Sequence, residues 1–168
     1  GTLRAHQCTC LIRSPQLLEQ RRSEGRTEQP AAVVVSRSPD FSSAWRFFNQ
    51  PLQRWLLAPE PVDQGFDRWF PLAPTWPERL QALGAAGIQR LVLLGGAQLS
   101  ADLLQADCVD ALQLTLVPQL LGGRFSWLPC TNAPLPAALA QPGAWQSEGA
   151  EDLGDGEWLV RYRRIRSG

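Results

Sequence analysis

Two adjacent glycines, Gly95 and Gly96, stand between an apolar run and an amphipathic helical pattern, where a chain can bind phosphate. Glycine lets the backbone approach a ligand closely, and the next helix offers unpaired N–H groups and the positive end of its dipole to an anion. The pattern is compatible with a phosphate site, but a tight strand-to-helix turn with nothing bound is the commoner cause of a Gly-Gly pair. The sequence contains neither GxGxxG nor GxxxxGK[ST], which excludes the Rossmann fingerprint and the P-loop.

A serine–arginine pair, Ser36-Arg37, follows a short apolar run that we expect to be a buried strand. A hydroxyl and a guanidinium at the end of a strand can together hold a phosphate monoester, such as the 2′-phosphate of NADPH. An exposed loop without a ligand explains the two residues equally well. The pair is therefore a second candidate anion site beside the glycine turn.

His6, Cys8 and Cys10 are spaced by single residues and resemble half of a metal site. A tetrahedral zinc needs about four ligands, and the other two cysteines, Cys108 and Cys130, stand alone. We therefore expect no metal, and we expect Cys108 to lie in the core on an apolar helix face. No carboxylate pair stands out either, so the sequence indicates no catalytic residue.

Alternating strands and helices must position these groups. We expect strands over five ranges, 31–36, 54–59, 89–94, 110–117 and 157–165, and helices over 77–86 and 97–108. The alternation indicates an α/β layered domain, in which the strands of Leu91 and Leu114 pair in parallel and the last strands are antiparallel. Residues 129–156 are predicted to be mostly loop. Without a repeat or a linker, we expect one domain over residues 1–168.

The chain carries 16 basic residues, all arginine, and 16 acidic residues, so its formal net charge is zero. With this balance the net charge produces no long-range electrostatic attraction to nucleic acid or membranes, and we expect neither as a partner. No apolar run approaches the length of about 18 residues that spans a bilayer, and no secretory signal is visible. We therefore expect a cytoplasmic protein with reduced thiols. Because the sequence contains no methionine, we also expect the chain to be a fragment.

The block from Leu91 to Gly123 resembles the end of the reductase domain in bacterial riboflavin deaminase/reductases. That family shows a strand, an acidic residue, a glycine-containing turn, a helix, a Val-Asp pair, and a strand ending in proline and a Leu-Leu-Gly turn. Here Val109-Asp110 matches the pair, and the stretch from Gly1 to Arg13 is similar to the family's Gly-Thr…Ala-Asp-Asp-Pro…Arg segment. The resemblance covers residues 1–123, and the rest of the chain fits it less closely.

The resemblance implies a dihydrofolate-reductase-like, three-layer α/β fold with a mixed, mostly parallel sheet flanked by helices. The family's first strand and helix lie upstream of the position of Gly1, so this chain is expected to lack them. The implied enzyme is an NADPH-dependent pyrimidine reductase of riboflavin biosynthesis, which reduces the ribosyl group of 5-amino-6-(5-phosphoribosylamino)uracil to ribityl. Its implied partner is a small phosphorylated ribosylaminopyrimidine, and the family commonly forms homodimers.

The same resemblance assigns site residues by position. The cofactor set, which includes the residues of both candidate phosphate sites, is Thr2, His6, Ser36, Arg37, Gly95, Gly96, Ala97, Gln98 and Leu99. The substrate set is Cys10, Arg13 and Leu94. Within it, Arg13 is expected to hold the substrate through its phosphate.

Two positions depart from the family pattern. Leu94 occupies the place of an acidic residue that contacts substrate, and His6 stands where the family usually has an aspartate near the cofactor. Leucine accepts no hydrogen bond, so a buried polar group of the substrate would lose a partner there, at a cost of about 1–3 kcal/mol. The departures leave two alternatives: a reductase of the same fold and cofactor with a different substrate, and a non-catalytic nucleotide-binding homologue.

Overall fold

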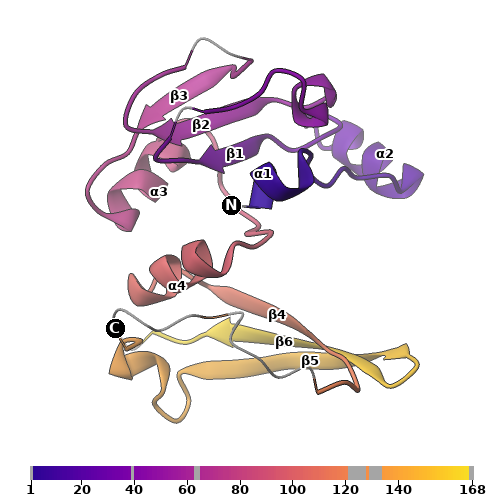
Figure 1. Ribbon diagram of the computed structural model, residues 1–168. Coiled ribbons are helices and arrows are strands. Elements are labelled where there is room, and N and C mark those ends of the chain that lie inside the picture. The colour runs from indigo at the N-terminus through magenta and orange to yellow at the C-terminus, as the bar shows by residue number, and fades with distance from the viewer. Residues whose placement is uncertain (1, 39, 63–64, 121–127, 129–133, 167–168) are drawn as a thin grey trace. The chain divides into compact units, whose positions relative to one another are not determined.

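The computed structural model describes residues 2–38, 40–62, 65–120, 128 and 134–166. The chain divides into two compact units, Gly1–Leu91 and Val92–Gly168, and each unit contains its own three-stranded sheet (Figure 1). The fold is therefore mixed α/β, as expected, and one domain over residues 1–168 stays a prediction.

The first unit is built on a parallel sheet in the order β1-β2-β3, formed by Ala32–Val35, Arg54–Ala58 and Arg68–Pro71. β2 lies in the centre, and its last four residues are buried. Strands that are covered on both faces read as continuous apolar runs. For this reason the runs at 31–36 and 54–59 predicted strands, and both predictions are confirmed.

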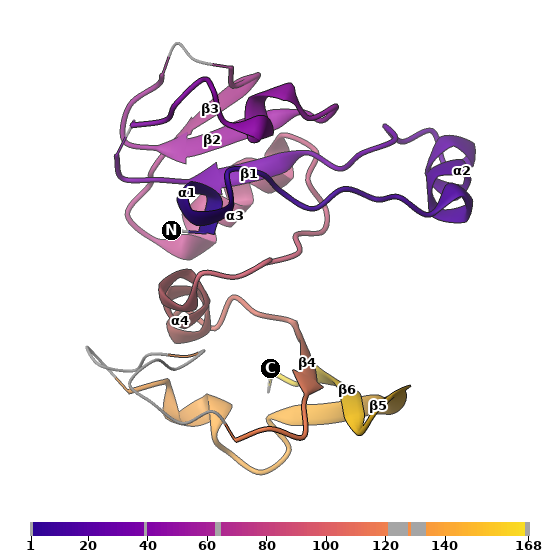
Figure 2. The ribbon, with the colours of Figure 1, turned by 45° about the vertical axis from the view of Figure 1, so that its right-hand side comes forward.

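Aromatic side chains cover one face of this sheet. Leu56 and Ala58 pack there with Phe41, whose ring meets Phe66 edge to face with centroids 5.2 Å apart. The partly buried side chains around this cluster are Leu3, Val34, Trp45, Phe48, Val62 and Phe66. Because side chains alternate along a strand, Trp55 points to the opposite face. In Figure 2, α1 lies in front of this sheet and α3 behind it.

The helices of the first unit are α1 (Thr2–His6), α2 (Pro15–Ser23), α3 (Trp76–Ala85) and the short 3-10 helix η1 (Arg46–Asn49). α3 begins at a capping box, in which the Thr75 hydroxyl accepts a hydrogen bond from the Glu78 N–H and the Glu78 carboxylate accepts one from the Thr75 N–H. It ends shortly before Gly87, which has a φ of 104°. The helix predicted over 77–86 is therefore confirmed with a shift of one residue.

The second unit contains α4 (Ala97–Gln105) and an antiparallel sheet in the order β4-β6-β5. Its strands are Ala111–Leu116, Glu157–Arg164 and Trp145–Gly154, and the 3-10 helix η2 (Ala137–Leu139) precedes β5. Asp155 and Gly156 close the β5–β6 hairpin with φ angles of 53° and 79°. The antiparallel pairing expected for the last strands is confirmed.

β5 corrects the prediction of mostly loop over residues 129–156. Its residues are nearly all exposed and mostly polar, so no alternation of apolar and polar residues marks the strand. Pairing with β6 along its length defines it instead. The part of the prediction over residues 129–133 lies outside the described residues.

The strand predicted over residues 89–94 is wrong. Leu91, Val92, Leu93 and Leu94 are between 40% and 81% exposed, and no pairing partner for them occurs among the residues that the structure describes. The parallel pairing predicted with the strand of Leu114 is also wrong, because β4 pairs antiparallel with β6. An apolar run becomes a strand only where a neighbour satisfies its N–H and C=O groups.

α4 is shorter than the helix predicted over residues 97–108. Asp107 adopts a left-handed φ of 48°, a conformation that does not continue a right-handed helix. Cys108 therefore lies beyond α4 and is half-buried, so its predicted place on the apolar face of the helix is wrong. Burial raises the pKa of its thiol.

An ion pair joins the end of α4 to the sheet of the second unit. The Arg164 side chain is only 4% exposed, and it donates from Nε and Nη2 to the two carboxylate oxygens of Asp107 at 3.0 and 3.1 Å. Its Nη1 donates to the Ala144 carbonyl at 3.0 Å. The hydrogen bonds from Arg164 hold the pKa of Asp107 below its usual value. The pair thus links Asp107, two residues past the end of α4, to the end of β6 and to the turn before β5.

We expect Asp107→Asn to lower the free energy of unfolding by about 2 kcal/mol at neutral pH, because Arg164 would stay buried without its counter-charge. The folded pKa of Asp107 is lowered, so its stabilisation is present above the unfolded pKa of about 3.9 and is lost as the pH falls through the folded value. In urea titrations, the difference between the variant and the wild-type protein should therefore shrink below a pH of about 4.

Glu151→Gln is a matched control, because Glu151 pairs with Arg161 at 2.8 Å on an exposed surface. Such pairs contribute less than about 1 kcal/mol. A deficit of Asp107→Asn that stays constant from neutral to acidic pH would contradict the role given to this pair.

Candidate functional site

The glycine turn lies at the start of α4, as the sequence predicts. Gly95 and Gly96 have φ angles of 111° and 94°, a region that favours glycine, and Gly96 is the N-cap of the helix. As a glycine, this N-cap residue has no side chain that could cap the helix. The N–H groups of the first helical residues have no partner inside an α-helix, and here they belong to Ala97, Gln98 and Leu99. The turn therefore offers backbone donors to an anion.

The predicted site residues fall in both compact units. Those in the first unit are Thr2, His6, Cys10, Arg13, Ser36 and Arg37, and those in the second are Leu94 and Gly95 to Leu99. Leu94 directly precedes the glycine turn and is 58% exposed. Its side chain offers no hydrogen bond to a ligand, so the donors that residues 94–96 present are backbone N–H groups.

The Ser36–Arg37 pair lies directly after β1, where it was predicted. Ser36 is buried, and its hydroxyl donates to the Ser38 carbonyl at 2.6 Å and accepts from the Ser38 N–H at 3.3 Å. The hydroxyl therefore shapes its own loop. Arg37 is exposed, so its guanidinium is the group of this pair that the loop presents to solvent.

Arg4 ties α1 to the loop that contains Ser36 and Arg37. Its Nη2 donates to the carbonyl oxygens of Ser38 at 3.2 Å and of Asp40 at 3.1 Å, and its guanidinium lies 5.4 Å from the centre of the Phe41 ring. The structure thus brings α1, which ends at the exposed His6, together with this loop. No local sequence pattern predicts this role for Arg4, because its partners lie more than 30 residues away along the chain.

The segment from Cys8 to Arg13 holds two of the predicted substrate residues and forms neither helix nor strand. Buried glutamines bind its backbone: Gln50 pairs with Thr9, and Gln29 pairs with Ile12. Cys10 and Arg13 are exposed on this segment. Sequence reasoning missed both glutamines, since an isolated glutamine in a loop carries no pattern.

No metal site emerges from the parts of the chain that the structure describes, where no three His, Cys, Asp or Glu side chains gather. Cys8, Cys10 and Cys108 are free thiols, and Cys130 lies outside the described residues. None of the described helices is long and apolar enough to cross a membrane.

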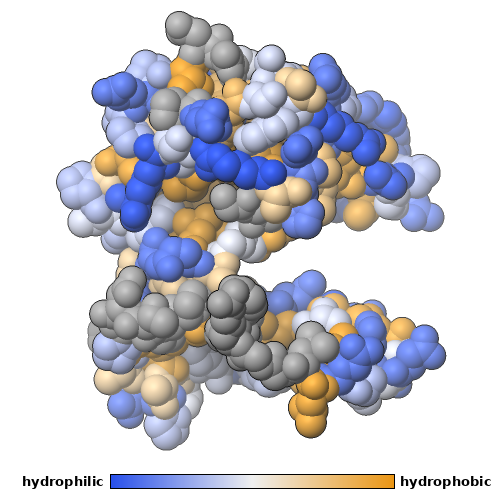
Figure 3. All heavy atoms as spheres, viewed as in Figure 1, coloured by the Kyte–Doolittle hydropathy of each residue, from blue (hydrophilic) through white to orange (hydrophobic). Residues whose placement is uncertain are grey.

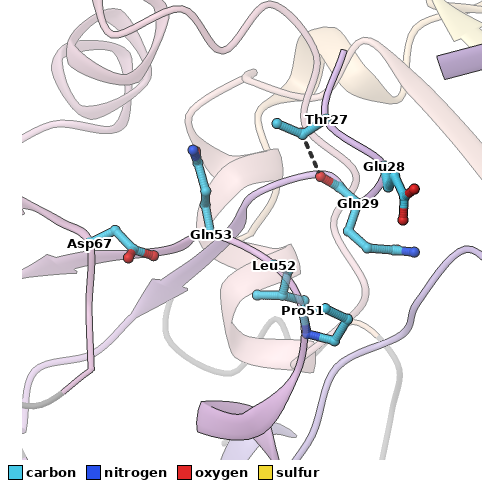
Figure 4. Close-up of a pocket in the computed structure, with 7 residues that line it drawn as sticks. All are labelled: Thr27, Glu28, Gln29, Pro51, Leu52, Gln53 and Asp67. Atoms are coloured by element: carbon cyan, nitrogen blue, oxygen red, sulfur yellow. Dashed lines mark hydrogen bonds between the residues drawn. The ribbon is translucent and has the colours of Figure 1, made fainter. Parts of the chain in front are cut away.

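A small surface cavity of about 240 Å³ lies in the first unit (Figure 4). It is lined by Thr27, Glu28, Gln29, Pro51, Leu52, Gln53 and Asp67. No predicted site residue is among them, and ligand pockets usually measure about 300–1,000 Å³. The cavity is therefore not the candidate site.

Comparisons with known proteins agree on one family. The family described as "RibD C-terminal domain" matches residues 4–154. The riboflavin biosynthesis protein RibD of Haemophilus influenzae is 30% identical over 133 residues, which cover 76% of this chain and 35% of that protein. The 2,5-diamino-6-ribosylamino-4(3H)-pyrimidinone 5′-phosphate reductase of Archaeoglobus fulgidus is 26% identical over 140 residues, which cover 77% of this chain and 64% of the relative. The chain thus spans only part of each curated relative.

Solved structures share the fold at low sequence identity. RibD of Acinetobacter baumannii superposes with a TM-score of 0.73 at 23% identity, over 98% of this chain and 45% of that one. A pyrimidine reductase-like protein from Corynebacterium diphtheriae gives a TM-score of 0.79 at 19% identity, over 99% of this chain and 73% of that one. The expected reductase-domain fold is therefore confirmed.

We expect Gly95→Ala to destabilise the protein by about 1–3 kcal/mol, the usual cost of such a backbone conformation in a non-glycine residue. A Cβ at Gly95 would meet nothing within 4 Å, so the effect would come from the φ of 111° alone. Gly84→Ala is the matched control, because Gly84 lies in α3 and its Cβ also meets nothing within 4 Å. That variant should gain about 0.5–1 kcal/mol. Urea unfolding measures both, and equal effects would argue against a strained turn.

Proposed function

Since the chain belongs to the family of RibD C-terminal domains, we propose that it is an NADPH-dependent reductase of riboflavin biosynthesis. The proposed reaction reduces the ribosyl group of 5-amino-6-(5-phosphoribosylamino)uracil to a ribityl chain. The family match over residues 4–154 carries the proposal. The names of the curated relatives, a riboflavin biosynthesis protein and a pyrimidinone 5′-phosphate reductase, support it. We propose a cytoplasmic location, which the free thiols of the described cysteines support.

The turn at the start of α4 fits a nicotinamide dinucleotide, the cofactor class that a reductase of this family implies. The N–H groups of Ala97 to Leu99 would hold the pyrophosphate, because the N-cap Gly96 has no side chain to bond them. The exposed guanidinium of Arg37 would hold the 2′-phosphate that distinguishes NADPH from NADH. Thr2 and His6 of α1 complete the proposed cofactor set.

NADPH supplies the hydride when it is bound, and the residues of this chain bind and orient the partners. The exposed Arg13 would bind the substrate phosphate through charge-assisted hydrogen bonds, with Cys10 three residues before it. Leu94 would border the pyrimidine without accepting a hydrogen bond from it. The proposed contribution of this chain is therefore orientation and anion binding.

A reductase of the same cofactor with a different substrate is the second candidate. Leu94 and His6 favour it, because both replace acidic residues that the resemblance places at the site. This candidate predicts NADPH binding without turnover of the riboflavin precursor. The absence of any nicotinamide binding would instead favour a non-catalytic homologue.

We expect the protein to bind NADPH more tightly than NADH, measured by quenching of the fluorescence of its seven tryptophans. Arg37→Gln should weaken NADPH binding about ten- to hundredfold, since a hydrogen bond to a charged group contributes about 1.5–3 kcal/mol, and should leave NADH binding unchanged. Arg46→Gln is the control, because Arg46 is also an exposed arginine of the first unit but lies on η1. A loss of NADPH affinity shared by both variants would contradict the role of Arg37.

We expect Leu94→Glu to raise kcat/KM for the riboflavin precursor about tenfold, because the carboxylate restores a hydrogen-bond acceptor worth about 1–3 kcal/mol. The measurement follows NADPH oxidation. Leu93→Glu is the control, since Leu93 is the neighbouring residue and is also exposed. If the wild-type protein and Leu94→Glu both bind NADPH and neither oxidises it with this precursor, the second candidate replaces the first.

A further inference from the structure

Two buried glutamine side chains hold the segment that carries Cys10 and Arg13. The Gln50 amide accepts from the Thr9 N–H at 2.8 Å and donates to the Thr9 carbonyl at 2.7 Å. The Gln29 amide accepts from the Ile12 N–H and donates to the Ile12 carbonyl, both at 2.9 Å. Each amide therefore makes the pair of hydrogen bonds that one residue of a neighbouring strand makes in an antiparallel sheet.

The backbones of both glutamines are themselves fixed. The Gln50 N–H donates to the Phe47 carbonyl at 3.2 Å, and the Gln50 carbonyl accepts from Nη1 of Arg54 at 2.9 Å. The Gln29 carbonyl accepts from the Thr27 hydroxyl at 2.7 Å, the bond drawn in Figure 4. Both side chains are at least nine-tenths buried, so water does not compete strongly for their amides. The glutamines thus form a rigid support rather than mobile contacts.

This support sets the direction of the exposed residues. Thr9 and Ile12 are the two points at which the backbone is held, Cys10 lies between them, and Arg13 follows the second point directly. A further bond, from the Phe47 N–H to the Gln7 carbonyl at 2.8 Å, holds the chain just before the segment. A segment fixed in this way loses little conformational entropy when it binds a ligand.

We propose that Gln29 and Gln50 are positioning residues for the substrate site, and that Gln29 orients Arg13 toward the phosphate of a phosphorylated ribosyl substrate. The inference rests on the proposed function, in which Arg13 binds that phosphate. Gln29 acts on Arg13 through Ile12, the residue before it, whereas Gln50 acts on Cys10 through Thr9. The two glutamines therefore affect different ends of the same segment.

The test is Gln29→Met, which keeps the length of the side chain and removes both hydrogen bonds to Ile12. KM for the phosphorylated pyrimidine should rise about tenfold, which corresponds to about 1.4 kcal/mol. kcat and the Kd of NADPH should stay unchanged, since the Gln29 amide bonds the Ile12 backbone and Gln29 is not in the proposed cofactor set. A fall in kcat without a rise in KM, as a general loss of folded protein would produce, overturns the proposal.

Arg13→Gln completes a double-mutant cycle with Gln29→Met. If Gln29 acts through Arg13, the double variant should show no higher KM than Arg13→Gln alone. Additive increases overturn the proposal. The matched control is Gln53→Met, because Gln53 is an exposed glutamine that lines the same small cavity as Gln29 (Figure 4). This control should leave KM unchanged.

A binding measurement separates this inference from the proposed function. Ribose 5-phosphate serves as the probe, and hydrogen exchange reports on the amides of Thr9 and Ile12. Gln29→Met should weaken probe binding and expose the Ile12 amide to exchange while the Thr9 amide stays protected. If the wild-type protein binds the probe but does not turn over the pyrimidine, the proposed reaction fails, and weaker probe binding in Gln29→Met still supports the positioning role. Unchanged probe binding in Gln29→Met overturns the positioning role.

Discussion

Buried side chains that bind backbone atoms hold the irregular segments of this protein in place. Gln29 and Gln50 pair with the segment before α2, and Arg164 joins Asp107 to the carbonyl of Ala144. Buried N–H and C=O groups outside helices and sheets need such partners, because an unpaired group costs about 1–3 kcal/mol. These side chains supply the hydrogen bonds that a neighbouring strand would supply in a sheet.

The candidate binding residues depend on this support. Cys10 and Arg13 lie on the segment that the two glutamines hold, and Arg37 lies in a loop that the Ser36 hydroxyl closes and Arg4 ties to α1. Binding groups on loops are effective when a rigid scaffold positions those loops. In this protein the scaffold is the buried parallel sheet of the first unit, whose central strand β2 is covered on both faces.

The second unit presents its candidate groups differently. The glycine turn presents backbone N–H groups, and two glycines with positive φ define its conformation. The ion pair between Asp107 and Arg164 fixes the other end of the same helix against the sheet. α4 is therefore held at its C-terminal end, while the backbone N–H groups of its first turn have no partner within the helix.

The sequence by itself determined the features that depend only on residues close to one another along the chain. The glycine turn, the start of α3 at Thr75 and the apolar runs of β1 and β2 are such features, and the resemblance over the Leu91–Gly123 block indicated the family. Only the tertiary structure decided which segments pair. The polar β5 is a strand because it pairs with β6. The apolar run at residues 89–94 does not form a strand, since no pairing partner for it occurs among the described residues. It also decided which polar groups are buried, because the partners of Gln29, Gln50 and Arg164 lie 17, 41 and 57 residues away along the chain.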